Sequence, residues 1–458
     1  MIFSLDDTIV AIATPLGSGG IGIVRLSGSN SLPIVQKIFR PTNKRLTNLK
    51  PRYLHFGKII HPETHFPIDE ALVAYMPKPH SYTCQDVVEI QSHGSTIALQ
   101  QILQLVLSLG ARPAEAGEMT LRAFINGRLD LTQAEAVLDI INAKTTAGLR
   151  IATQQLSGVL SVPVSQVRHK LVNTLAFLEA SIDFVEDDIP YENVIPPLQE
   201  VITELEQLIS TASHGMIYRQ GIRTAIVGKP NVGKSSLLNA LLRGERAIVT
   251  DIPGTTRDTL EETANIHGIP LVLVDTAGIR TKASDTVEKI GIDRSHQALH
   301  QADLALMVVD MNMPLSIEDW EIAHLMENKT TILILNKCDL PHICVIPENF
   351  LPETPHVYLS ALKGDGLEKL ENTITNQIIG GHVVSADEPI ISNPRHVALL
   401  KQAVLFTQEA ITAHVAGLSP DLVSIDVCEA VDVLGQITGE SATEDLLNII
   451  FSRFCIGK

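Results

Sequence analysis

The hydrophobic pattern changes along the chain, and its first part predicts a mixed α/β unit. Short β-rich runs at 21–28, 71–76 and 86–91 are separated by turn-forming Pro, Gly and Asn residues. An amphipathic helix is expected at 97–109, after the third run. Residues 1–118 are therefore predicted to fold as one mixed α/β domain.

From about residue 120 the apolar positions recur at helical spacing. Thr132 and Glu135 match a capping box, which predicts that a helix begins there. Helices are expected to continue to about residue 215, with a break near the acidic segment 185–190. Their apolar faces are predicted to hold Ala134, Val137, Leu138 and Ile141 in one helix and Val167, Leu171, Leu175, Leu178 and Ile182 in another.

Between residues 221 and 380 apolar strands alternate with helix-compatible stretches. This alternation is typical of a doubly wound, largely parallel sheet. The strands are expected at 223–227, 271–275, 304–310, 331–336 and 356–360.

Helical spacing returns after residue 390, where Ser441 and Glu444 match a second capping box. The apolar face of this last helix is predicted to contain Leu446, Leu447, Ile450 and Phe454. We therefore predict one discontinuous helical domain with an α/β domain inserted into it. The predicted bounds are 1–118 for the N-terminal domain, 119–220 and 381–458 for the helical domain, and 221–380 for the insertion.

Composition excludes several classes of protein. The chain has 458 residues, of which 45% are hydrophobic and 19% charged, so about three globular domains are expected. No apolar run approaches the roughly 18 residues of a membrane span, and the first residues resemble neither a signal nor a transit peptide. Five scattered cysteines without a C-x-x-C pair disfavour a zinc site and suit a reducing compartment. We therefore expect a cytoplasmic protein without stable membrane insertion.

The net charge of −17 limits how the chain could bind nucleic acid. Proteins that hold nucleic acid through bulk phosphate attraction are usually basic. Any such partner is therefore expected to be held by a local patch or by specific contacts.

Residues 228–235, GKPNVGKS, fit the phosphate-binding pattern G-x-x-x-x-G-K-S. The segment lies between a predicted strand and a predicted helix, which disfavours a chance glycine-rich turn. Lys234 is expected to reach the β and γ phosphates of a bound nucleotide, and the Ser235 hydroxyl is expected to coordinate Mg²⁺. The residues predicted to bind the nucleotide here are Asn231, Val232, Gly233, Lys234, Ser235 and Ser236.

Three further loops follow predicted strands. Asp275 is expected to hold Mg²⁺ through water, and the Gly278 amide to meet the γ-phosphate. Asp339 offers two carboxylate oxygens to the two N–H donors of guanine, which adenine cannot match. The residues predicted to bind GTP in these loops are Asp275, Thr276, Ala277, Gly278, Asn336, Lys337, Asp339, Ser360, Ala361 and Leu362.

The loop at 250–258 is predicted to be the mobile switch, with Thr256 as a second hydroxyl on Mg²⁺. Its residues predicted to bind GTP are Thr250, Asp251, Ile252, Pro253, Gly254, Thr255 and Thr256. Ile279 stands where many small GTPases place the glutamine that orients water. Glu288 is a candidate for that role, although the residues alone favour a solvated carboxylate.

No arginine finger is evident, since Arg257 and Arg280 near the switches are equally compatible with structural roles. We therefore expect an extra cation or a second subunit to neutralise charge in the transition state.

The chain resembles the MnmE (TrmE) family of bacterial tRNA modification GTPases from end to end. The matching segments are GIVR at 22–25, DVVEI at 86–90, NGRLDL at 126–131, the GTPase motifs with TDIPGTTRD at 250–258, and FCIGK at 454–458. The resemblance implies an N-terminal folate-binding and dimerisation domain, a discontinuous helical domain and an inserted Ras-like GTPase domain. It also implies a homodimer that forms a heterotetramer with the flavoprotein MnmG.

The implied activity is modification of tRNA. With MnmG, members of the family add a carboxymethylaminomethyl or aminomethyl group to C5 of the wobble uridine (position 34), using a folate-borne one-carbon unit. In this family K⁺ takes the place of the finger, and here its ligands would be Asn231, Thr250, the Ile252 carbonyl and Thr255. The carboxylate that orients water maps onto Glu288, which would make Glu288 catalytic together with Lys234.

The family binds 5-formyltetrahydrofolate or a related tetrahydrofolate, and its ligands map onto Arg25, Glu89, Arg128 and Lys458. Some relatives have lysine at position 128, and Arg and Lys differ in donor geometry. From the residues alone, surface salt bridges would explain both arginines. Cys455 is interpreted as either a catalytic thiol or a buried structural one; prenylation is excluded, since no polybasic stretch precedes it.

Two other functions remain open at this point. One is a ribosome-assembly or other RNA-binding GTPase switch without modification chemistry, although such proteins usually carry a basic RNA-binding domain. The other is a GTP-gated folate enzyme that acts on a small molecule.

Overall fold

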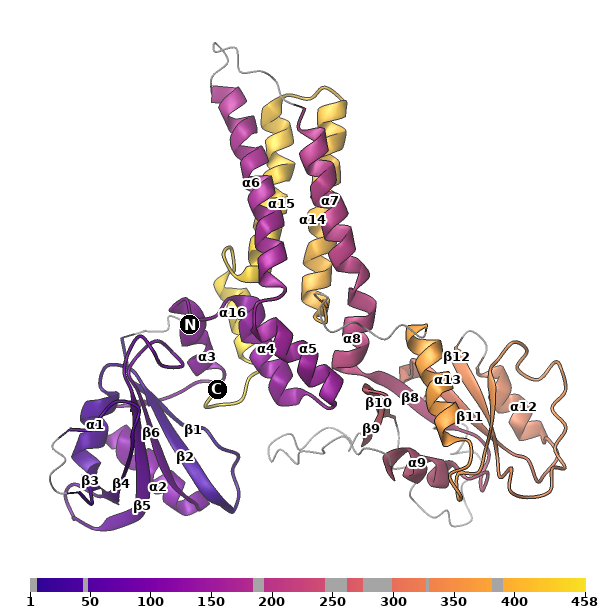
Figure 1. Cartoon of the computed structure of the whole chain (residues 1–458), viewed down its shortest axis with the longest axis horizontal. Helices are drawn as coiled ribbons and strands as arrows, with labels where there is room; N and C mark the ends of the chain where they lie inside the picture. Colours follow the sequence, from indigo (N-terminus) through magenta and orange to yellow (C-terminus); the bar gives the residue numbers. More distant parts are fainter. Residues whose placement is uncertain are drawn as a thin grey trace.

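The structure is a computed structural model that describes residues 6–43, 48–183, 193–243, 262–274, 299–326, 329–380 and 390–458. A long helical bundle stands between two α/β units (Figure 1). One unit is formed by the N-terminal residues, and the other is inserted between two halves of the bundle. The C-terminus returns to the N-terminal unit, where Ile456 pairs with Ala116 in an antiparallel bridge (Figure 1).

The N-terminal unit is built on a sheet with the strand order β3-β4-β5-β6-β2-β1-β7 among the described residues. Its pairs are antiparallel except β1 with β7. Apolar residues of α1 and α2 share one core with the strands, so both helices cover the sheet. The elements are β1 (Ile9–Ile12), β2 (Gly19–Ser27), α1 (Ser31–Ile38), β3 (Phe39–Pro41), β4 (Leu54–Ile60), β5 (Pro67–Met76), β6 (Val87–Gly94), α2 (Thr96–Ser108) and β7 (Arg112–Pro113).

Three of these strands and one helix were expected. The runs at 21–28, 71–76 and 86–91 lie in β2, β5 and β6, and the helix expected at 97–109 is α2. The strands β1, β3, β4 and β7 were not predicted. Two of them, β3 and β7, have only three and two residues, too short for an alternating pattern.

The helical domain combines two distant segments of the chain. Residues of α6, α7, α14 and α15 share one buried cluster, which forms the long bundle of Figure 1. The shorter α3, α4, α5, α8 and α16 lie at its base (Figure 1). The helices are α3 (Glu118–Ile125), α4 (Leu131–Asn142), α5 (Thr146–Leu156), α6 (Ser161–Asp183), α7 (Ile195–Ser210), α8 (Ala212–Gln220), α14 (Pro394–Val415), α15 (Pro420–Thr438) and α16 (Glu444–Phe451).

Both predicted capping boxes are wrong. The helix α4 is capped by Asp130, whose side chain accepts from the Gln133 amide, while the Gln133 side chain accepts from the Asp130 amide. Thr132 lies inside the helix and donates its hydroxyl to Asp130. The last helix is capped by Thr443. In both cases a better-placed cap lies two residues away from the expected one.

The inserted unit contains a sheet with the strand order β13-β12-β11-β8-β10-β9 in the described ranges. Every pair is parallel except β10 with β9, which confirms the largely parallel fold. Two separate cores cover its faces, one with α9 and α13 and the other with α12, as a doubly wound sheet requires. The elements are β8 (Ile222–Val227), α9 (Lys234–Arg243), β9 (Glu262–Ile266), β10 (Ile269–Leu273), β11 (Leu304–Asp310), α12 (Ile317–His324), β12 (Thr330–Asn336), β13 (His356–Leu359) and α13 (Leu367–Ile379).

The antiparallel β9 was not predicted, because its five residues lack an apolar run. A search of the described helices for a stretch long and apolar enough to cross a bilayer finds none.

Candidate functional site

The predicted phosphate loop joins the end of β8 to the start of α9, at Lys234. Its glycines have backbone angles that other residues rarely adopt, with φ of 146° at Gly228 and 105° at Gly233. A Cβ at Gly228 would collide with the Val308 carbonyl oxygen, and one at Gly233 with the Asn336 amide. The tight wrap of this loop therefore depends on glycine at both positions.

Lys234 folds back across the phosphate loop. Its Nζ donates to the carbonyl oxygens of Gly228, at 2.6 Å, and Lys229, at 2.8 Å. Burial lowers the pKa of Lys234. Ser235 and Ser236 follow in the first turn of α9 and are exposed. A helix N-terminus preceded by such a loop attracts phosphate through its free N–H groups and its dipole.

Asn336 connects the phosphate loop to the loops predicted to hold the base. Its Nδ2 donates to the Val232 carbonyl oxygen at 2.7 Å, and its Oδ1 accepts from the Ala361 amide at 3.0 Å. Since Asn336 is buried, both bonds are protected from water. Three loops that are far apart in the sequence are thereby held at one edge of the sheet.

Asp339 stands beside the last strand of the sheet. A hydrogen bond with Ser360 lowers the pKa of Asp339, and the Lys363 Nζ lies 3.6 Å from its Oδ2. Its carboxylate therefore stays ionised near neutral pH and can accept two hydrogen bonds. Leu362, in the same group of loops, is 83% exposed.

Two residues at this edge were not predicted. Asp310, at the end of β11, accepts from the Lys337 Nζ at 2.6 Å, and the same Nζ donates to the Asn231 carbonyl oxygen at 3.0 Å. On the other side, Asp319 is fully buried and pairs with Lys229 at 2.8 Å. The position of Asp310 at the end of a predicted strand was a signal for the first of these contacts.

Many of the predicted site residues lie outside the described residues. They are Thr250, Asp251, Ile252, Pro253, Gly254, Thr255, Thr256, Asp275, Thr276, Ala277, Gly278 and Glu288. They include all predicted metal ligands except Ser235 and Asn231.

A second cluster lies on the N-terminal sheet. Arg25 in β2 and Glu89 in β6 are direct cross-strand partners, and the Arg25 Nε donates to the Glu89 Oε1 at 2.8 Å. The Arg25 Nη1 also donates to the Gly457 carbonyl oxygen at 3.4 Å. The structure therefore brings Arg25, Glu89 and the backbone next to Lys458 together, and their role in binding folate stays a prediction.

Arg128 is held apart from that cluster. Its guanidinium stacks over the Tyr82 ring, 4.7 Å from the centroid, and donates to the Tyr82 carbonyl oxygen at 3.2 Å. Among the described residues, no hydrogen bond or ion pair joins it to Arg25, Glu89 or Lys458. Tyr82 was not predicted, since a single aromatic residue before a turn carries no distinctive signal.

Cys455 is exposed, so the interpretation as a buried structural thiol is wrong. Its carbonyl oxygen accepts from the Lys458 amide at 3.3 Å and from the Gly117 amide at 3.5 Å. The bond from Gly117 and the bridge between Ala116 and Ile456 hold the terminal segment against the N-terminal unit. A catalytic role for Cys455 stays a prediction.

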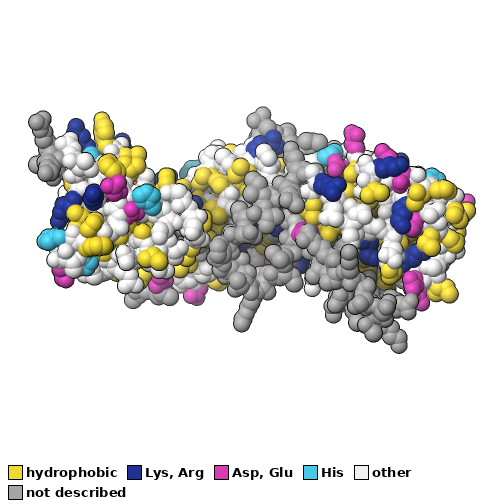
Figure 2. All heavy atoms as spheres, turned by 90° about the horizontal axis from the view of Figure 1, so that it is seen from below, with side chains coloured by type: hydrophobic (Ala, Val, Ile, Leu, Met, Phe, Trp, Pro, Cys, Tyr) yellow, Lys and Arg dark blue, Asp and Glu magenta, His cyan; other side chains and the backbone are white. Residues whose placement is uncertain are grey.

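Charge on the described surface is mixed. On the face seen from below, Lys and Arg side chains are interspersed with acidic and apolar ones over both α/β units (Figure 2). This distribution agrees with the acidic overall charge and with binding through local contacts.

A glycine-rich loop between strand and helix, a lysine across it and an N-K-x-D loop at the same sheet edge define a P-loop GTPase. Comparison with known families gives two matches. The family described as "MnmE helical domain" matches residues 131–455, and that described as "GTP-binding protein TrmE N-terminus" matches residues 8–128.

Relatives match over nearly the whole chain. A tRNA modification GTPase MnmE from Desulforamulus reducens is 47% identical over 99% of this chain and 100% of its own length. One from Chloroflexus aurantiacus is 48% identical over 99% and 100%. A solved structure of Era from Aquifex aeolicus is 28% identical over 40% of this chain and 65% of its own, with a TM-score of 0.25. The chain belongs to the MnmE family of tRNA modification GTPases.

Proposed function

We propose that the chain is a potassium-activated GTPase of the cytoplasm that works as a homodimer with the flavoprotein MnmG. Together they add a carboxymethylaminomethyl or aminomethyl group to C5 of the wobble uridine of certain tRNAs, using a folate-borne one-carbon unit. One observation carries this proposal. The last residues of the chain meet Arg25, the ion-pair partner of Glu89, so a chain with GTPase loops also presents a second polar cluster.

The residues of the phosphate loop suit GTP and Mg²⁺. Lys234 would bind the β and γ phosphates, and the Ser235 hydroxyl would join Mg²⁺, together with Thr256 and Asp275. The Asp339 carboxylate would accept hydrogen bonds from the two N–H donors of guanine. The argument that this loop binds phosphate rests on the bonds of the Lys234 Nζ to the Gly228 and Lys229 carbonyl oxygens, because they hold the ammonium group against the phosphate loop.

Asn231 suits a K⁺ site. It is exposed and has a φ of 60°, and its backbone oxygen is already bonded to Lys337. No hydrogen bond joins its side chain to the rest of the described chain, so its amide oxygen can serve a cation. K⁺ is bound through oxygen atoms, and Thr250, Ile252 and Thr255 would supply the others. The cation would neutralise charge that a finger arginine neutralises elsewhere, and Glu288 would orient water.

The Arg25–Glu89 pair suits a tetrahydrofolate. A carboxylate accepts from paired N–H groups such as those of a pterin ring, and Arg25 with Lys458 offers donors to carboxylates. Arg128 would join them only through movement of its side chain away from Tyr82. A bound folate would supply the one-carbon unit for the reaction.

Mass spectrometry of tRNA nucleosides tests the proposal most directly. Cells that lack the gene should lose the modified wobble uridine, and a plasmid copy should restore it. Unchanged nucleosides would contradict the proposal and favour a GTPase switch of the ribosome-assembly type. Loss of a small folate product without change in tRNA would favour the small-molecule enzyme.

The cation is tested separately, by GTP hydrolysis in KCl and in NaCl. We expect at least about tenfold faster hydrolysis in KCl, a modest share of the roughly 10³-fold effect of an arginine finger. Asn231→Ala should remove this difference, whereas Lys369→Ala, on the exposed side of α13, should keep it. Equal rates of the intact protein in both salts would refute the K⁺ assignment.

A further inference from the structure

The inserted GTPase unit is attached to the helical domain through two chain segments that lie side by side. The outgoing segment is α8, which ends at Gln220 and leads into β8 and the phosphate loop. The returning segment, 390–393, leads into α14. Arg219 of the first segment donates to the Ser392 carbonyl oxygen of the second at 3.5 Å. We call these two segments the neck.

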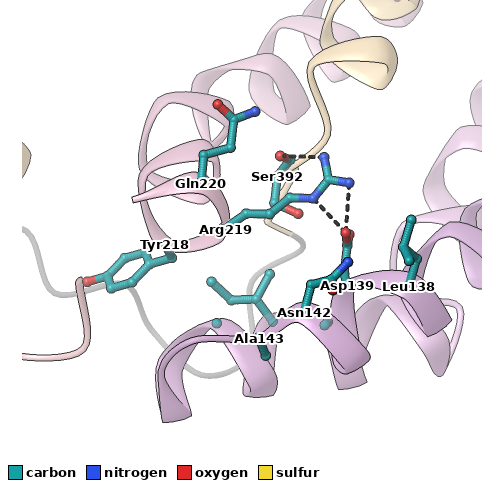
Figure 3. A pocket seen from close by; sticks show the side chains of 11 residues that line it. Leu138, Asp139, Asn142, Ala143, Tyr218, Arg219, Gln220 and Ser392 are labelled. Atoms are coloured by element: carbon teal, nitrogen blue, oxygen red, sulfur yellow. Dashed lines mark hydrogen bonds and ion pairs between the residues drawn. The ribbon is translucent and has the colours of Figure 1, made fainter. Parts of the chain in front are cut away.

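One helix, α4, contacts both segments of the neck through two carboxylates one turn apart. Glu135 contacts the returning segment, and Asp139 contacts the outgoing one. Figure 3 shows Arg219 reaching from α8 to Asp139 on α4 and to Ser392. The two carboxylates differ in how completely they are bonded.

Glu135 is saturated with donors. Its Oε1 accepts from Asn393 and from the Arg395 Nε, both at 3.0 Å, and its Oε2 accepts from the Arg395 Nη2 at 2.6 Å and from His396 at 2.7 Å. Burial raises the pKa of Glu135, but the bonds from His396 and Arg395 outweigh burial and lower it to about 2. Removing a partner from such a buried network is strongly destabilising. This contact therefore fixes the returning segment.

Within the described part of the chain, Asp139 accepts hydrogen bonds from Arg219 alone. Its Oδ1 accepts from the Arg219 Nε at 2.8 Å and the Nη2 at 2.7 Å. Its Oδ2 is buried and has no hydrogen-bond partner among the described residues. Burial raises the pKa of Asp139, which shows that Arg219 does not fully offset the loss of water. An unpaired buried oxygen makes this contact the weaker of the two.

Space for movement lies beside this weaker contact. A cavity of about 220 Å³, partly open to solvent, is lined by Asp139, Arg219 and Ser392 together with apolar residues of α4, α5 and α8. Because this space is partly open to solvent, the Arg219 side chain has room beside Asp139 to adopt a second arrangement. The cavity is open to Tyr218, whose ring belongs to an apolar cluster shared by the helical domain and the GTPase unit.

The opposite end of α4 meets the C-terminal segment. Leu131 and Ala134, in its first turn, share a buried cluster with Phe451 and Phe454. Phe454 directly precedes Cys455, and the chain then continues to the Gly457 contact with Arg25. Twelve residues of helix span about 18 Å. The helix α4 thus contacts both the neck and the C-terminal segment that continues to the Gly457 contact with Arg25.

We propose that Asp139 and Arg219 are positioning residues whose ion pair, which we call the latch, breaks and re-forms, while the bonds of Glu135 stay in place. Through this difference, α4 transmits a movement of the GTPase unit to the Arg25–Glu89 cluster. The proposal rests on the function proposed above. It requires two states of the neck, with the latch closed in one and open in the other, because spatial intermediacy alone does not establish coupling.

Hydrogen–deuterium exchange of the full-length protein detects the two states without tRNA. Peptides from α4 and α8 should take up deuterium at different rates with GDP and with GDP plus aluminium fluoride in KCl. In Asp139→Asn the uptake should be fast with both ligands. Equal uptake of the unaltered protein with both ligands would overturn the latch.

Activity measurements separate coupling from folding. Asp139→Asn should keep the GTP hydrolysis rate within about twofold but lower wobble-uridine modification about fivefold or more, the lower bound of typical coupling energies. Asp139→Glu should restore modification, because the cavity has room for one more methylene group. Glu200→Gln is the matched control, since Glu200 pairs with Lys170 on the exposed bundle surface far from the neck. Full modification by Asp139→Asn would overturn the proposal.

The two proposals fail in different ways. If the unaltered protein modifies no uridine, the proposed function is wrong, and the exchange data still decide whether the latch exists. If the unaltered protein modifies uridine but the exchange rates do not respond to the nucleotide, the latch is wrong and the function stands.

Discussion

The phosphate loop and the Arg25–Glu89 cluster are assembled in opposite ways. The phosphate loop is local: the residues from Gly228 to Ser235 are consecutive, and their backbone groups do most of the binding. The second cluster joins Arg25 to Gly457, which are 432 positions apart. A consecutive motif carries its own geometry, whereas a cluster of distant residues depends on the fold of every domain between them.

Replacement of Lys234 should have the largest effect, and it should change GTP hydrolysis at the phosphate loop without changing folate binding at the Arg25–Glu89 cluster. Lys234→Ala removes the ammonium group that spans the phosphate loop, and loss of such a preorganised charge typically lowers rates about 10²- to 10³-fold. Single-turnover GTP hydrolysis measures this, and binding of 5-formyltetrahydrofolate should be unaffected. Lys369→Ala, on the exposed side of α13, should hydrolyse GTP normally. If Lys234→Ala also lost folate binding to a comparable degree, the two regions would not be independent.

Replacement of Asp339 tests whether guanine is read by side-chain chemistry. Asp339→Asn exchanges an acceptor for a donor, so GTP affinity should fall about 10- to 100-fold, as expected for loss of a charged hydrogen bond. Xanthosine triphosphate, which carries an oxygen where guanine carries an amino group, should then bind better than GTP. Fluorescent nucleotide titration measures both affinities. Glu368→Gln, an exposed carboxylate of α13, should bind GTP as before.

Replacement of Arg25 tests the other region. Arg25→Ala should weaken 5-formyltetrahydrofolate binding about tenfold, because one charged hydrogen-bonding group is lost. GTP hydrolysis should stay unchanged. Lys58→Ala removes an exposed ion pair with Glu70 on the same sheet and is the matched control. Calorimetric titration decides the outcome, and equal affinities for all three proteins would remove Arg25 from the site.

Acid should affect the helix between the two regions, with the smallest effect of the four. Glu135 has a pKa of about 2 in the folded chain against an ordinary 4.5, so its stabilising contribution is present above pH 4.5 and is lost as the pH falls toward 2. Burial also lowers the pKa of His396 below its ordinary 6.5, so protonation in the unfolded chain opposes folding below pH 6.5. Both effects lower stability on acidification. The unfolding temperature should fall by several degrees between pH 7 and pH 3, and Glu135→Gln should show a shallower dependence below about pH 4.5.

Prediction from sequence succeeded where one local pattern determines the structure. The strands that end at Val227, Asp310 and Asn336 were expected, because long apolar runs followed by polar residues mark buried strands. The short β3 and β7 were missed, since pairing with neighbouring strands determines them.

The errors share a physical cause, which is competition between nearby groups. Glu135 matched a capping pattern, but its carboxylate is bonded to residues of α14 that are about 260 positions away. Asp130 displaced Thr132 as the cap because its carboxylate reaches the Gln133 amide. The contact of Arg25 with the C-terminal segment was expected only from family resemblance. No residue spacing in the sequence predicts a contact between segments so far apart.

The insertion determines the order in which the parts of the chain can fold during synthesis. The core of the bundle needs residues from α6 and α7 and also from α14 and α15. A ribosome makes α6 and α7 first, then the entire GTPase unit, and only then their partners. Domains generally fold as units during synthesis, so the GTPase unit can fold while the apolar faces of α6 and α7 still lack a partner. A chain that stops before α14 would expose those faces permanently, and early termination here should leave an aggregating product around a folded GTPase.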